Sequence, residues 1–153
     1  MTNSILLIFK NPCLMPALVG WASAQFLKVI LTLVLLRKMD VTRFVGEGGM
    51  PSAHSAFVMA LTVSMGLNYG FDSAYFAMSA ALASVVMYDA AGVRRAAGKQ
   101  AAKINRIIKH LMEKSSDYQD TEKQLRELLG HTPLEVVAGA LLGIIIAILW
   151  VLF

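Results

Sequence analysis

Apolar residues run along this chain in four long blocks that polar stretches separate. The first block, 15–36, is long enough to cross a bilayer. The blocks 54–69 and 73–89 are shorter and rich in small residues, which suits close contact between helices. The last block, 133–153, is strongly apolar throughout. This pattern predicts four main membrane-spanning helices.

The polar stretches between the blocks differ in character. Residues 1–13 are too short to span, and we expect them to lie in the membrane interface or to pack on the bundle. Residues 92–114 repeat apolar side chains every three or four positions with basic side chains on other faces, which predicts an amphipathic basic helix. Such a helix suits an anionic membrane surface or a second copy of the chain, and the sequence does not choose. A second short helix is expected over 121–129.

The composition is that of a membrane protein. Hydrophobic residues make up 57% and charged residues 16% of 153 positions, and the mean hydropathy is +0.61, outside the range of soluble domains. A single cysteine excludes an internal disulfide. We therefore predict an all-α fold, a polytopic membrane helical bundle of about four main spans. It forms a single membrane domain, 1–153, with 92–130 a cytoplasmic helical insertion between the third and last spans.

The net charge of +4 comes from two basic stretches. All of the 14 Lys and Arg residues except Lys10 and Lys28 fall within 37–43 or 94–126. Basic clusters that flank apolar segments follow the positive-inside rule, so they indicate the cytoplasmic face of a bacterial-type plasma membrane. The same placement argues against nucleic acid as a partner.

A glycine-rich turn, 48–55, opens directly into the second apolar block. Its sequence is Gly-Gly-Met-Pro-Ser-Ala-His-Ser, in which Ser52 and Ser55 can cap the following helix and His54 lies in the first turn. Backbone N–H groups, hydroxyls and a histidine at a helix N-terminus suit an anion such as phosphate. An ordinary loop with a helix cap explains the same residues equally well.

Two further polar clusters map to the same membrane face. Asp89 ends a span close to Arg94 and Arg95, which suits either a buried ion pair or phosphate binding, because one arginine can donate two bonds to a phosphate. His131 and Glu135 are four residues apart, so a helix would place them on one face and the carboxylate would fix the ring tautomer. A helix-capping cluster and a zinc pair completed by another histidine are the alternatives.

Lys28 lies inside the first span, where a charged side chain is costly and often functional. It either extends to the cytoplasmic surface or reaches an anion held near that surface. Together the lysine, arginine, histidines, carboxylate and glycine-serine turn suit phosphoryl transfer. Cations and amides would hold the oxygens, one histidine would attack, and another would protonate the leaving oxygen.

Three motifs in this order resemble a known superfamily. The segment Pro51-Ser52-Ala53-His54 is similar to the P-S-G-H motif of the type 2 phosphatidic acid phosphatase and vanadium haloperoxidase superfamily. G-G-M-P-S-A-H-S-A, M-Y-D-A-A-G-V-R-R and E-L-L-G-H-T-P-L-E-V resemble its divergent small membrane branch, and the likeness covers nearly the whole chain from about residue 24. The chain departs from the superfamily in Ala53 for glycine, in Glu135 for aspartate, and in the long separation of Arg94 from His131.

The resemblance implies a metal-independent phosphatase without a cofactor. His131 would be the nucleophile, Glu135 the acid that orients it, and His54 the acid that protonates the leaving group. The phosphate-binding residues that it implies are Lys28, Ser52, Gly49 and Arg94, with Arg95 as the alternative arginine and with Asp89 and Ser55 in supporting positions.

We therefore expect a membrane-embedded lipid phosphate phosphatase that acts through a phosphohistidine, with its active site facing the cytoplasm. A precursor phospholipid made on that face fits, phosphatidylglycerophosphate being one candidate, and a polyprenyl diphosphate is the alternative substrate. Two other classes stay open: a non-catalytic protein that binds anionic lipid or a partner, and a small transporter that uses Lys28 and Asp89. The small-residue spans also suit a homodimer.

Overall fold

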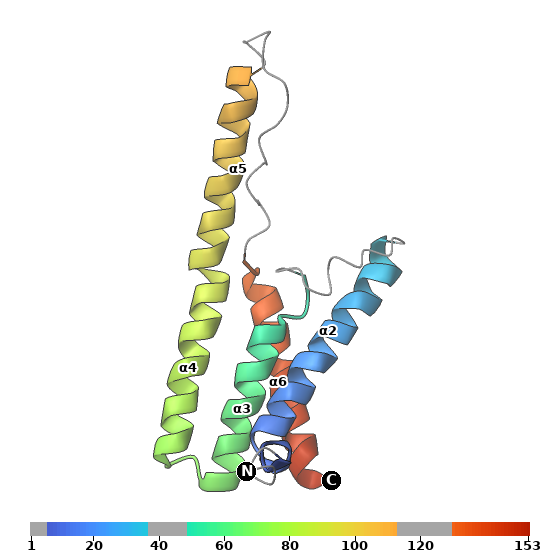
Figure 1. The fold of residues 1–153 in the computed structure, drawn as a ribbon, viewed down its shortest axis with the longest axis vertical. Helices are drawn as coiled ribbons and strands as arrows, with labels where there is room; N and C mark the ends of the chain where they lie inside the picture. The colour runs from blue at the N-terminus through green and yellow to red at the C-terminus, as the bar shows by residue number, and fades with distance from the viewer. Residues whose placement is uncertain (1–5, 37–48, 113–129) are drawn as a thin grey trace.

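The computed structural model describes residues 6–36, 49–112 and 130–153, and every regular element in these ranges is helical. Figure 1 shows how the elements are arranged. They are a short 3-10 helix η1 (Ile8–Lys10) and the α-helices α2 (Leu14–Leu36), α3 (Ala53–Tyr69), α4 (Ala74–Ala91), α5 (Val93–Met112) and α6 (Pro133–Leu152). The predicted all-α bundle is confirmed.

Helix α3 lies at the centre and contacts α2, α4 and α6. The side that it buries carries small residues, among them Ala56 and Ala60 one turn apart. Gly20 of α2 approaches this side closely, because a Cβ built on it would lie 3.2 Å from the Ala56 carbonyl oxygen. Small side chains on facing helices let the backbones come close, which is how helices associate within a membrane.

Helix α6 packs on α3 through two glycines one turn apart. A Cβ on Gly143 would overlap the carbonyl oxygen of Ala56, and a Cβ on Gly139 would overlap the carbonyl oxygen of Ser52. The two glycines thus form a small-residue seam of the GxxxG type. The seam brings the first turns of α3 and α6 together at one end of the bundle.

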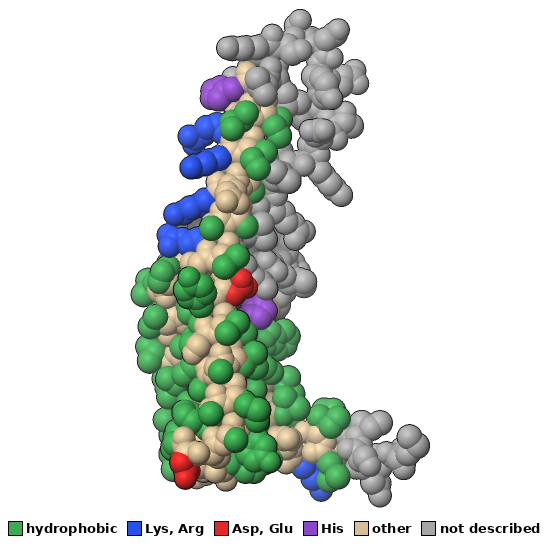
Figure 2. Space-filling model, turned by 90° about the vertical axis from the view of Figure 1, so that its left-hand side faces the viewer, with side chains coloured by type: hydrophobic (Ala, Val, Ile, Leu, Met, Phe, Trp, Pro, Cys, Tyr) green, Lys and Arg blue, Asp and Glu red, His purple; other side chains and the backbone are tan. Residues whose placement is uncertain are grey.

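Within the described ranges, three helical stretches are long and apolar enough to cross a membrane: Leu14–Val34, Ala74–Ile108 and Pro133–Leu152. The remaining predicted span is α3, whose 17 residues extend about 25 Å, less than a hydrocarbon core of about 30 Å. It is shorter than its neighbours and is largely buried between them. Hydrophobic side chains cover much of the bundle face that Figure 2 shows, as expected for contact with lipid.

The predicted amphipathic basic helix is α5, and it does not fold back across the end of the bundle. It continues the direction of α4 and extends past the ends of α2, α3 and α6 (Figure 1). Gly92 lies between α4 and α5 with φ −105° and ψ −81°. The second short helix predicted for 121–129 lies outside the described residues.

Replacement of Gly143 by alanine tests the glycine seam. We expect Gly143→Ala to destabilise the protein by about 1–3 kcal/mol, because its methyl group would overlap the Ala56 carbonyl even though alanine favours a helix more than glycine does. The measurement is the unfolding of the purified protein in detergent. Val137→Ala, at a position of α6 that is 53% exposed, is the control and should change stability little. Equal stability of Gly143→Ala and wild type would contradict the seam.

Candidate functional site

The N-termini of α3 and α6 meet at one end of the bundle. Ser52 is the N-cap of α3, and its backbone N–H donates to the carbonyl oxygen of Glu135 in the first turn of α6 at 3.0 Å. The first turn of a helix carries N–H groups without intrahelical acceptors and the positive end of the helix dipole. At this junction the first two N–H groups of α3, those of Ala53 and His54, suit a bound anion.

Hydroxyl groups stabilise the turn at residues 52–55, which we call the Ser52 turn. The Ser52 Oγ accepts a bond from the Ser55 backbone N–H at 3.3 Å and from the Ser55 hydroxyl at 3.0 Å. Both serines are fully buried, and His54 between them is exposed. Ser52 is therefore the cap, whereas Ser55 supports it instead of capping the helix itself.

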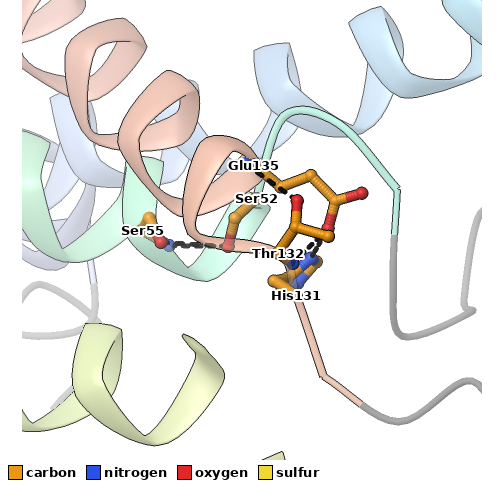
Figure 3. Close-up of polar contacts among 5 residues, drawn as sticks. All are labelled: Ser52, Ser55, His131, Thr132 and Glu135. Carbon is orange, nitrogen blue, oxygen red and sulfur yellow. Dashed lines mark hydrogen bonds and ion pairs between the residues drawn. The ribbon is translucent and has the colours of Figure 1, made fainter. Parts of the chain in front are cut away.

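A second hydrogen-bonded cluster lies at the start of α6 and consists of His131, Thr132 and Glu135 (Figure 3). Thr132 is the N-cap, its hydroxyl accepts from the Glu135 N–H at 3.4 Å, and its own N–H donates to the Glu135 Oε2 at 2.9 Å. This reciprocal pair is a capping box. The same Oε2 lies 3.2 Å from the His131 Nδ1. One carboxylate oxygen thus holds the helix start and the histidine together.

The predicted His131–Glu135 contact is present, but it forms through the helix-capping cluster that the sequence left as an alternative and not through a shared helix face. His131 does not lie on a helix face, because α6 begins at Pro133 after the Thr132 cap. Glu135 instead reaches back from the third helical position past the cap. The ring is therefore held by the capping geometry and not by the i, i+4 spacing of a helix.

The Glu135 contact determines the tautomer of His131. An ionised carboxylate only accepts hydrogen bonds, so the Nδ1 must carry the proton when it bonds to Glu135. The Nε2 of the neutral ring then keeps its lone pair. This assignment follows from the hydrogen-bond partners, and it leaves the Nε2 free to act as a nucleophile.

Burial lowers the pKa of His131 below its ordinary value, and it is the largest influence. The hydrogen bond and the negative charge of Glu135 raise this pKa, whereas the positive charges of Lys28 and His54 lower it further. The net result favours the neutral ring at pH 7. A histidine held neutral beside cations is suited to attack an electrophile.

Lys28 brings a positive charge to the same cluster. It comes from α2 and is only 3% exposed. Its alkyl chain lies against Gly49, since a Cβ built there would be 3.4 Å from the Lys28 Cγ and Cδ. Gly49 also has a φ of +87°, so glycine is required there for its backbone conformation.

The end of α4 holds His131 from the other side. The His131 backbone N–H donates to the carbonyl oxygen of Ala90 at 2.9 Å. The residues that flank the long insertion therefore meet in space.

The remaining predicted site residues lie at the end of α4 and the start of α5. Asp89 is half-buried in the last turn of α4. Arg94 is in the first turn of α5, and its side chain lies outside the described residues. Arg95 is exposed.

Ala53, which stands where the superfamily motif has glycine, is the first residue of α3. Its methyl group is buried in a cluster with Ala24 and Ala56. A helical backbone does not require glycine. Alanine therefore fits this turn and adds to the contact between α2 and α3.

Among the described residues, no group of three or more His, Cys, Asp or Glu side chains is placed to hold a metal ion. The zinc alternative therefore finds no ligand set in this part of the chain.

Sequence reasoning missed three contributors to the site. Thr132 could have been found from the Thr-x-x-Glu spacing before an apolar run, and Gly139 from the glycine pair in the last block. The carbonyl of Ala90 carries no sequence signal, because a backbone acceptor is available at every residue.

Comparisons with known proteins agree with the sequence motifs. A family model described as the divergent PAP2 family matches residues 9–146. An uncharacterised membrane protein of Bacillus subtilis (strain 168), YuiD, is 39% identical over 154 residues, which cover 95% of this chain and 98% of that protein. No solved structure gives a significant match.

The histidine titrations test the site geometry. We expect the pKa of His131, followed by NMR of the ring resonances, to lie below the ordinary histidine value. Glu135→Gln should lower it further because a stabilising charge is lost, and Lys28→Met should raise it because a repelling charge is lost. His110→Gln, on α5, is the control and should leave it unchanged. A His131 pKa that responds to none of these changes would rule out the cluster.

Proposed function

Because the chain belongs to the divergent PAP2 family, we propose that it is a membrane-embedded phosphatase that hydrolyses a lipid phosphate through a phosphohistidine. PAP2 denotes the type 2 phosphatidic acid phosphatases. The observation that carries the proposal is the buried His131, whose Nδ1 is held by Glu135 at the junction of two helix N-termini.

In the first step the His131 Nε2 attacks phosphorus. A P–N bond forms while the ester P–O bond breaks, and protonated His54 gives its proton to the leaving oxygen. The exposed position of His54 allows it to exchange protons with water. Glu135 stabilises the positive charge that develops on the attacking ring.

In the second step a water molecule attacks the phosphohistidine. His54, now neutral, accepts the proton of that water, the P–N bond breaks, and phosphate leaves with His131 restored. The Lys28 ammonium and the backbone N–H groups of Ala53 and His54, the first two residues of α3, would stabilise the negative charge on the phosphoryl oxygens. We assign the arginine role to Arg94, because Arg95 is exposed and lies in line with other exposed basic residues of α5.

The surroundings of the site support an amphiphilic substrate. Met50, just before the Ser52 turn, is 43% exposed, and Leu134, between Thr132 and Glu135, is 67% exposed. Exposed apolar side chains next in sequence to the buried Ser52 and the capping residues of α6 suit a phosphate that is attached to a lipid tail. The basic excess on this side favours a cytoplasmic orientation and hence phosphatidylglycerophosphate as the first substrate to test.

Phosphate release from a lipid panel tests the proposal. The full chain in proteoliposomes should release phosphate from phosphatidylglycerophosphate, phosphatidic acid or a polyprenyl diphosphate, and EDTA should not change the rate. His131→Gln should reduce the rate to background, and His54→Gln should lower it by about 10²–10⁴-fold.

His110→Gln is the matched control, because it removes a histidine of α5 outside the proposed site. It should release phosphate at the wild-type rate. Equal release by wild type and His131→Gln would end the phosphatase proposal, and loss of activity in EDTA would instead indicate a metal-dependent reaction.

A further inference from the structure

Helix α5 carries positive charge away from the membrane-embedded bundle. It continues α4 past the ends of α2, α3 and α6 (Figure 1), and its 20 residues extend about 30 Å. The segment Val93–Met112 contains six Lys and Arg residues and no Asp or Glu. Nothing within the helix therefore neutralises its charge.

The two sides of α5 differ. On one side Gly98 and Ala101 are buried and Ile108 is half-buried. On another side the basic residues are exposed, at successive spacings of four, four and three. We name this set the basic row: Arg95, Lys99, Lys103 and Arg106. Figure 2 shows Lys and Arg side chains (blue) in a line along one edge of the helix, above the hydrophobic surface of the bundle.

The spacing of the row matches a helical partner. Residues at i and i+4 are about 6 Å apart along a helix axis, so a second helix with acidic residues at the same spacing can face the row charge by charge. We propose that the basic row is a docking surface for an acidic helical segment of another protein. It lies outside the phosphate site and stands whether or not the chain hydrolyses phosphate.

An anionic membrane is a poorer occupant of the row. The row rises about 16 Å along α5, whereas the surface potential of a bilayer decays over about 8 Å at physiological salt.

Nucleic acid and a second copy of the chain fit the row less well. Val93–Met112 contains no Phe, Tyr or Trp on which bases would stack. A second copy would bring the same positive charges to the row, and like charges repel. An acidic segment meets neither objection.

Binding of a designed peptide tests the proposal. The probe is a fluorescent helical peptide with glutamates at positions 1, 5, 9 and 12, and its control has the same composition with the glutamates spread around the helix. The full chain is held in nanodiscs of phosphatidylcholine. We expect the ordered peptide to bind about 10-fold tighter than its isomer and to weaken with salt.

Single charge reversals locate the surface. Lys103→Glu should weaken binding of the ordered peptide by about 10-fold, and a peptide with one facing glutamate changed to lysine should restore it. Lys10→Glu makes the same change of net charge outside α5 and should have no effect. Equal binding of the two isomers, or an equal loss with Lys10→Glu, would overturn the proposal.

Two further binding measurements distinguish an acidic partner from nucleic acid and from lipid. A single-stranded oligonucleotide that binds the row more tightly than the ordered peptide would assign the row to nucleic acid and overturn the proposal. Loss of peptide binding when the nanodisc contains phosphatidylglycerol would show that the row is held by lipid and would overturn it as well. Peptide binding that persists in that nanodisc, with the oligonucleotide bound more weakly, supports the acidic partner.

Discussion

The close approach of α6 to α3 is the constraint on which the rest of the structure depends. Gly139 and Gly143 leave no side chain between the two backbones, so the Ser52 N–H reaches the Glu135 carbonyl. Any larger residue at Gly139 would separate them. With the contact in place, two helix N-termini share one end of the bundle, and the buried Lys28 and His131 join them there.

The chemistry of the site follows from this packing. Glu135 serves as the capping residue of α6 and as the partner of His131, so the stability of the helix start and the orientation of the ring have the same cause. Burial lowers the pKa of His131, and the Lys28 charge lowers it further. A neutral histidine nitrogen beside a positively charged lysine suits attack on a phosphate. This attack is the proposed reaction.

The helices could be predicted from the sequence because hydrophobic blocks of spanning length leave few alternatives. The Ser52 cap could be predicted as well, since the serine follows a glycine and a proline and precedes an apolar run. The place of His131 just before α6 could be predicted too, but the sequence could not choose between a helix face and a helix-capping cluster for its contact with Glu135, because i, i+4 spacing is compatible with both. The direction of α5 could not be predicted from the sequence, because an amphipathic pattern does not determine how a helix is oriented relative to its neighbours.

The most direct test of the central claim is the identification of the phosphorylated residue. The full chain in proteoliposomes is incubated with a ³²P-labelled lipid phosphate, quenched in alkali to preserve phosphohistidine, and digested for mass spectrometry. Label on the peptide that contains His131, absent from His131→Gln and retained in Glu135→Asp, is the predicted result. Turnover without labelled histidine, or label on a different residue, would contradict the account.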